Sequence, residues 1–166
     1  MAVATNRPSC AAAAFARERG IPVGELSQKK FSSADERDAA MRDFFWSRAV
    51  ELIVDAGYDR IHTQPFLEAF GGRIVNVHPS LLPDFAGGMD AVEQALQAGV
   101  KTTGATVHLV TGDLDAGPIL IQEPVPVLAG DTVETLRRRI HEAEYRILPQ
   151  AIRSMEARLA KSPAVG

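Results

Sequence analysis

Two short segments of the sequence carry polar side chains that could stabilise negative charge on a carbonyl oxygen. Asn76 and His78 stand at the end of an apolar, β-branched run and are followed by Pro79. Side chains alternate along a strand, so the amide and the imidazole fall on the same side, and the proline ends regular strand pairing. Ligands bind at the carboxyl edge of open α/β sheets, which makes this a candidate site. The same residues also fit a histidine that caps a strand end and an asparagine that satisfies a turn.

The second segment is an acidic turn at residues 113–118. Asp115 is our choice within it, because Gly117 and Pro118 hold such a turn in a fixed shape. A carboxylate beside an imidazole favours the imidazolium form, which stabilises negative charge on a carbonyl oxygen. The sequence therefore predicts that Asn76, His78 and Asp115 meet. Taken alone, an acidic turn is usually only a solvated loop.

Metal and nucleotide chemistry have little support in the sequence. The four histidines are far apart, no H-E-x-x-H pattern occurs and Cys10 is the only cysteine, so we expect no metal site. No G-x-G-x-x-G or Walker-type loop is present. His108 lies within an apolar strand, and we expect it to be a hydrogen-bonded core histidine.

Composition restricts the class of protein. The 166 residues are 46% hydrophobic and carry a formal net charge of −3 without a basic block, which argues against nucleic acid or an anionic membrane surface as a partner. No stretch reaches the roughly 20 apolar residues of a membrane span, and a single cysteine allows no intrachain disulfide. We expect one soluble, cytoplasmic domain over residues 1–166.

Strand and helix signals alternate along the chain. Capping patterns at Ser33 and Asp131 begin two helices, and Pro149 should kink the second of them. Strands are expected at 1–5, 52–54, 74–77, 105–110 and 119–122, and helices at 10–19, 33–50, 90–98 and from 131 onward. The predicted fold class is α/β and doubly wound, with a mostly parallel twisted sheet and helices on both faces.

The segments NVHPSLLP at 76–83 and GATVHLVTGDLDAGPIL at 104–120 together closely resemble the phosphoribosylglycinamide formyltransferase family. The similarity extends to about Arg158 and is weakest over 21–50. It implies a Rossmann-like formyltransferase fold. It also implies transfer of a formyl group from 10-formyltetrahydrofolate to the amine of glycinamide ribonucleotide in de novo purine biosynthesis, without a metal.

The resemblance also implies roles for individual residues. The implied catalytic residues are Asn76, His78 and Asp115. The implied folate-binding residues are Tyr58, Asp59, Arg60, Ile61 and His62 in one segment and Val110, Thr111, Gly112 and Asp113 in another. Glu144 and His141 are implied to bind the ribonucleotide, although a glutamate on an amphipathic helix is by default solvated. The implied partners are small-molecule substrates, and a homodimer is left open.

Three departures from the family pattern shape further expectations. The chain begins after the family's first strand and phosphate-binding loop, so the first β–α unit is expected to be missing. Asp59 and His62 place polar groups beside an apolar folate slot. The loop at 85–90 is one residue longer than the family's loop and lacks its proline.

Three alternatives to the transferase stay open. Formyltetrahydrofolate deformylase uses water as the acceptor, but it has a regulatory domain and two consecutive histidines where this chain has His78-Pro79. Methionyl-tRNA formyltransferase is less favoured because no basic C-terminal domain follows. The third alternative is a catalytically silent, folate-binding or oligomer-forming remnant that keeps the three polar residues.

Overall fold

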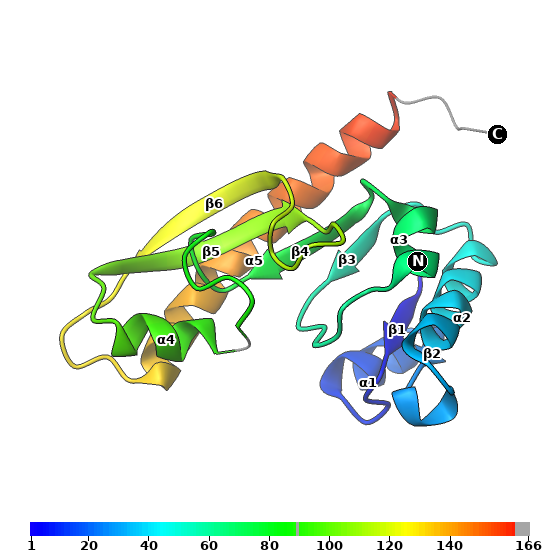
Figure 1. The fold of residues 1–166 in the computed structure, drawn as a ribbon, viewed down its shortest axis with the longest axis horizontal. Helices are drawn as coiled ribbons and strands as arrows, with labels where there is room; N and C mark the ends of the chain where they lie inside the picture. The colour runs from blue at the N-terminus through cyan, green and yellow to red at the C-terminus, as the bar shows by residue number, and fades with distance from the viewer. Residues whose placement is uncertain (89, 162–166) are drawn as a thin grey trace. The chain divides into compact units, whose positions relative to one another are not determined.

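The computed structural model describes residues 1–88 and 90–161, which belong to two compact units (Figure 1). Unit 1 comprises Met1–Ile53 and Arg60–Gly71, and unit 2 comprises Val54–Asp59 and the chain from Gly72 onward. The single domain expected over the whole chain stays a prediction. None of the helices in the described ranges is long and apolar enough to cross a membrane.

Unit 1 opens with a β–α–β arrangement. β1 (Val3–Thr5) pairs in parallel with β2 (Val23–Glu25), and α1 (Ala11–Glu18) connects the two strands. The chain leaves α1 through Gly20, which has a φ of +66°, a conformation that glycine adopts without strain. The strand and the helix predicted at the start of the chain are confirmed.

The rest of unit 1 is mainly helical. It contains the 3-10 turn η1 (Gln28–Lys30) and the helices α2 (Ala34–Trp46) and α3 (Gln64–Phe70). α2 begins at Ser33, whose hydroxyl accepts the Glu36 N–H at 3.1 Å, as the capping pattern predicts. Rings from both helices form an aromatic core with centroids 5.0 to 6.3 Å apart, and these rings are Phe45, Phe66 and Phe70.

The main sheet has four strands in the order β3 (Ile53–Asp55), β4 (Ile74–His78), β5 (Thr102–Leu109) and β6 (Ile119–Pro126). β4 runs antiparallel to β5, and β5 runs antiparallel to β6. The prediction of a mostly parallel sheet is therefore wrong for these strands. Apolar, β-branched runs report burial and not strand direction, and the turn between β5 and β6 is shorter than a parallel crossover requires.

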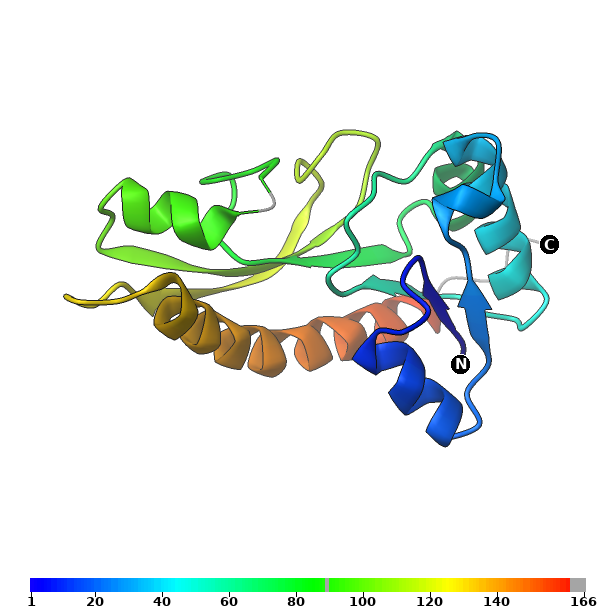
Figure 2. The same ribbon diagram turned by 90° about the horizontal axis from the view of Figure 1, so that it is seen from below.

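One long helix covers a face of the sheet in unit 2. α5 (Val133–Leu159) packs along this face on β5 and β6 (Figure 2), and α4 (Ala91–Gln97) packs against α5. The predicted covering of both faces by helices stays a prediction. α5 buries an apolar stripe that includes Leu136, Ile140 and Ile147. This packing leaves the opposite face of the sheet available for polar side chains.

The start of α5 differs from the prediction. Its N-cap is Thr132, whose hydroxyl accepts the Thr135 N–H at 3.2 Å, so the cap lies one residue beyond the predicted Asp131. The Asp131 carboxylate instead accepts bonds from the Leu128 N–H and the Arg139 guanidinium. α5 continues through Pro149 as one helix, and the kink expected there stays a prediction.

Candidate active site

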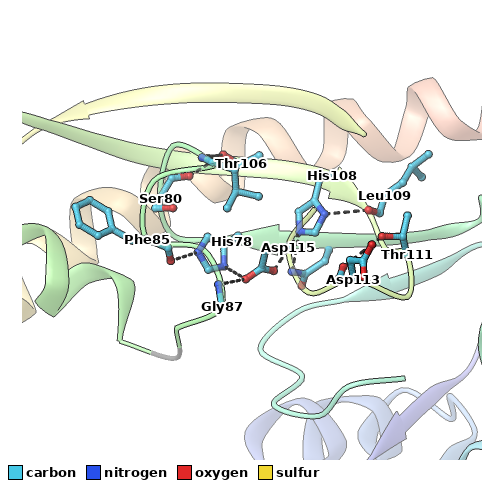
Figure 3. A network of polar contacts seen from close by, with 12 residues as sticks. His78, Ser80, Phe85, Gly87, Thr106, His108, Leu109, Thr111, Asp113 and Asp115 are labelled. Carbon is cyan, nitrogen blue, oxygen red and sulfur yellow. Dashed lines mark hydrogen bonds and ion pairs between the residues drawn. The ribbon is translucent and has the colours of Figure 1, made fainter. Parts of the chain in front are cut away.

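The face of the sheet opposite α5 carries a row of polar side chains. Asn76 on β4 pairs across the strands with His108 on β5, and His78 pairs with Thr106. Cross-strand neighbours point to the same face of an antiparallel pair. The antiparallel register therefore places two histidines and one asparagine on one face, and Figure 3 shows the two histidines with the acidic turn beside them.

Asp115 joins the two histidines from the turn between β5 and β6. Its Oδ2 lies 3.4 Å from Nδ1 of His78 and accepts the Gly87 N–H at 2.9 Å. Its Oδ1 lies 3.6 Å from Nε2 of His108. The side chain is only 8% exposed, so its charge interacts with both rings with little screening by water. The predicted meeting of Asn76, His78 and Asp115 is present in unit 2, with His108 as a fourth member.

His108 fixes the orientation of the Asn76 amide. Nδ1 of His108 lies 2.9 Å from the carbonyl oxygen of Leu109, which only accepts, so Nδ1 carries a hydrogen. Nε2 then has a free lone pair and accepts one Asn76 Nδ2–H at 3.1 Å. The second amide hydrogen of Asn76 stays available. The prediction of a hydrogen-bonded core histidine is confirmed, but its contact with Asn76 was not predicted.

Both ring nitrogens of His78 face hydrogen-bond acceptors. Nε2 donates to the carbonyl oxygen of Phe85 at 3.1 Å, and Nδ1 faces the Asp115 carboxylate. The second contact becomes a hydrogen bond only when Nδ1 is also protonated. Burial lowers the pKa of His78 from its usual value, while the Asp115 charge and the Phe85 carbonyl oppose this shift and His108 adds to it. The site can therefore take up one further proton between His78 and Asp115.

The loop after β4 is held by side chains from β5 and β6. The Thr106 hydroxyl donates to the Ser80 carbonyl at 2.7 Å and accepts the Leu82 N–H at 3.1 Å. Gln122 donates to the Leu82 carbonyl at 3.0 Å and to Thr106 at 2.8 Å. These bonds are part-buried or buried, and they fix the start of the loop that presents the Phe85 carbonyl and the Gly87 N–H to the site.

Gly117 allows the acidic turn to approach β5 closely. A Cβ atom at this position would lie 1.8 Å from the Leu109 carbonyl oxygen and 2.9 Å from its carbon. Real Cβ atoms do not come this close to a backbone, so a side chain would push the turn outward. The turn predicted from Gly117 and Pro118 is confirmed. Its close contact with β5 leaves room only for glycine at position 117.

We predict that Gly117→Ala destabilises the protein by about 2 to 4 kcal/mol, because the turn or β5 must move. Urea unfolding followed by circular dichroism measures this change. Gly112→Ala is the matched control, since no atom lies within 4 Å of a Cβ at Gly112 in the same turn. Equal stability of the two variants would contradict the close approach.

The predicted folate-binding residues fall in both units. Val110, Thr111, Gly112 and Asp113 lie between β5 and Asp115 in unit 2, where the Val110 N–H donates to the Ile74 carbonyl at 2.9 Å. The other predicted segment is divided, with Tyr58 and Asp59 in unit 2 and Arg60, Ile61 and His62 in unit 1.

His62 does not present its ring to solvent. The side chain is buried within unit 1, stacked on Phe66 with 4.4 Å between centroids, and its Nδ1 lies 4.0 Å from the Asp38 carboxylate. Ile61 is 61% exposed. The expectation that the His62 side chain is a polar group in a folate slot is therefore wrong for the ring, because the ring points into the interior of unit 1.

Glu144 lies on α5 with its side chain only 14% exposed. Burial raises the pKa of Glu144 to about 7, because the charged form is poorly solvated there. His141 lies 3.9 Å away on the same helix, but its side chain is 47% exposed. A well-solvated imidazole at this distance offsets little of the cost of burying the Glu144 charge.

We predict that Glu144→Gln stabilises the protein at pH 8 by up to about 3 kcal/mol and changes little at pH 4. The folded state holds this proton more tightly than the unfolded state does, so the parent loses stability as pH rises through the window from 4.5 to about 7. Urea unfolding at the two pH values measures the difference. The exposed neighbour Glu142→Gln is the control, and equal effects of Glu144→Gln at both pH values would contradict the account.

Within the described ranges, no group of three or more histidine, cysteine, aspartate or glutamate side chains could hold a metal ion. The two histidines and Asp115 lie near one another, but their nitrogens already contact carbonyl oxygens or Asn76.

Comparison with known proteins gives the class of protein to which this site belongs. A family model described as formyl transferase matches residues 1–152. The chain belongs to the formyl transferase family. The match begins at residue 1, and the expectation that a first β–α unit is missing is not supported.

Within this family the chain belongs with the phosphoribosylglycinamide formyltransferases. It is 44% identical to that enzyme of Mycobacterium tuberculosis (strain H37Rv) over 155 residues, which are 93% of this chain and 71% of the relative. The crystal structure of glycinamide ribonucleotide transformylase 1 from Symbiobacterium toebii matches with a TM-score of 0.89 and 45% identity, over 92% of this chain and 72% of that chain.

A longer relative also contains the matching region. The trifunctional purine biosynthetic protein adenosine-3 of Gallus gallus is 44% identical over 150 residues. The match covers 90% of this chain but only 15% of that protein. The match to the solved transformylase structure covers the region that contains the antiparallel strands β4 to β6. The α/β class predicted from the sequence is confirmed.

Proposed function

We propose that this chain transfers a formyl group from 10-formyltetrahydrofolate to the amine of glycinamide ribonucleotide in purine biosynthesis. One observation carries the proposal: the buried Asp115 carboxylate lies between His78 and His108, and His108 holds the amide of Asn76. The matches to phosphoribosylglycinamide formyltransferases support the choice of donor and acceptor. Small-molecule substrates and a cytoplasmic setting are part of the same proposal, and a homodimer stays an expectation.

The first step of the proposed reaction is attack of the neutral amine on the formyl carbon. A new carbon–nitrogen bond forms, and the carbonyl oxygen becomes an oxyanion. Asn76 stabilises this oxygen with its second Nδ2–H, since the first is held by His108. His78 contributes its Nε2–H, which bonds to the Phe85 carbonyl in the free protein. The Asn76 amide is held by His108 before the reaction and needs no reorganisation when the charge develops, whereas the His78 Nε2–H must exchange the Phe85 carbonyl for the oxyanion.

The second step breaks the bond between the formyl carbon and the folate nitrogen. The amine has lost one proton and the leaving nitrogen gains one, so the transfer is neutral overall. Asp115 favours a proton on Nδ1 of His78, which keeps the imidazole charged while the oxyanion exists. The pair can pass the proton onward through water. Because burial opposes the charged ring, the proton is held weakly enough to be released.

The proposed substrate-binding residues are those of the segments 58–62 and 110–113 and, on α5, His141 and Glu144. In unit 1 the proposed folate contact is the exposed Ile61, and in unit 2 it is the main chain of 110–113. Glu144, with His141 beside it, accepts hydrogen bonds from the ribonucleotide. Since burial raises the pKa of Glu144, hydroxyl donors that replace water also stabilise its charged form.

We predict that His78→Ala lowers the rate of formyl transfer to glycinamide ribonucleotide by at least about a thousandfold, because proton transfer and oxyanion stabilisation are both lost. Tetrahydrofolate binding, measured by isothermal titration calorimetry, should change less than about threefold. The transfer assay with the purified parent also tests the function itself. Formate release at an equal rate without the acceptor would favour the deformylase, and a parent that binds folate without any reaction would favour the silent remnant.

We predict that Asp115→Asn lowers the pKa of His78, since the carboxylate is the first of the contributions that raise it. Titration of the imidazole by NMR measures this pKa without any need for activity. Asp113→Asn is the control, because Asp113 is exposed in the same turn. An unchanged His78 pKa in Asp115→Asn would remove the carboxylate from the proposed proton path.

A further inference from the structure

Unit 1 contains a buried ion pair that the proposed chemistry does not use. Arg37 is 3% exposed and Asp38 is fully buried, and both lie on α2. Nε and Nη2 of Arg37 each lie 2.7 Å from Oδ1 of Asp38. Burying two charges costs solvation that their mutual attraction only partly repays.

The remaining bonds of this pair go to the main chain of another segment of unit 1. Oδ2 of Asp38 accepts the Thr63 N–H at 2.6 Å, and Nη2 of Arg37 donates to the Ile61 carbonyl at 3.3 Å. Nη1 of Arg37 is held by the Gln28 side chain at 3.0 Å. Hydrogen bonds to charged groups are stronger than neutral ones. Together the two side chains fix the backbone on both sides of His62.

The fixed backbone determines which side chains of the segment face inward. The His62 ring stacks on Phe66 inside unit 1, at an angle of 17°, and its Nδ1 lies 4.0 Å from Asp38. The neighbouring Ile61 is 61% exposed. Exposing a large apolar side chain forfeits the free energy of its burial, and a fixed, exposed apolar side chain is a suitable contact for an aromatic ligand.

We infer that Arg37 and Asp38 are positioning residues that hold the segment 61–63 in the shape that binds the folate. This inference rests on the proposed function, since it assigns the exposed Ile61 to that folate. It adds two residues that touch no substrate and act through the main chain of the segment. It also explains why a charged pair is kept in the interior next to an aromatic core.

The test compares two double variants on the same helix. Arg37→Leu/Asp38→Leu removes the buried pair as a unit, which avoids leaving one uncompensated charge. Arg42→Leu/Asp43→Leu is the matched control, because that adjacent pair has a 2.8 Å contact but Asp43 is 63% exposed. Each variant is assayed for kcat and for the separate KM values toward the folate donor and the ribonucleotide acceptor. Amide hydrogen exchange at Thr63 is measured in the same variants.

In the buried double variant we expect the folate KM to rise at least about tenfold and exchange at Thr63 to accelerate. The ribonucleotide KM and kcat should stay within about twofold, and the control variant should match the parent. Arg37→Gln/Asp38→Asn removes both charges together and keeps an acceptor for the Thr63 N–H, so it should raise the folate KM less than the leucine double variant. If the leucine variant does not fold, this polar double variant carries the test, and an unchanged folate KM with unchanged Thr63 exchange would overturn the inference.

The experiment distinguishes a failure of the inference about Arg37 and Asp38 from a failure of the proposed function. An active parent whose buried-pair variant keeps its folate KM would overturn the inference alone. A loss of kcat together with a rise in both KM values would also overturn it, because that result describes a general loss of structure. A parent that neither binds tetrahydrofolate nor transfers a formyl group would overturn the proposed function, and the inference with it.

Discussion

The contact of one carboxylate with two imidazoles is the interaction on which the site depends. Asp115 faces Nδ1 of His78 with one oxygen and Nε2 of His108 with the other. A buried charge of this kind is costly unless it is satisfied, and the Gly87 N–H donates to it at 2.9 Å, whereas Nε2 of the neutral His108 ring has no hydrogen to donate. The arrangement couples the proton on His78 to the ring that orients Asn76. Charge stabilisation and proton transfer are thus properties of one connected group of side chains.

The fold meets this requirement through strand register and a close turn. The antiparallel pairing of β4 with β5 sets Asn76 opposite His108. α5 covers the apolar face of the same sheet, so the polar face can be used for chemistry. The carboxylate then enters from the turn after β5, which lies against the Leu109 carbonyl because Gly117 has no side chain. Asp115 itself has a φ of +52°, an uncommon conformation for a residue other than glycine, which aspartate tolerates better than most.

The sequence predicted the chemistry of the site better than its geometry. Asn76, His78 and Asp115 were identifiable because strand alternation and turn residues are local signals. The role of His108 depends on the register between β4 and β5, which a prediction of parallel strands could not provide. The strand β2 has three residues, with Gly24 packed on Phe44, and the helix α3 is short, so neither has a periodic pattern long enough to detect. Arg37 and Asp38 were not identified because charges on a helix are normally read as its solvated face.

A double-mutant cycle between His78 and Asp115 tests the central claim most directly. The values of kcat/KM for formyl transfer are measured in the parent, in His78→Ala, in Asp115→Asn and in the double variant. If the carboxylate acts through the imidazole, the double variant should be no slower than His78→Ala alone. Losses that multiply, so that the two substitutions act independently, would contradict the account.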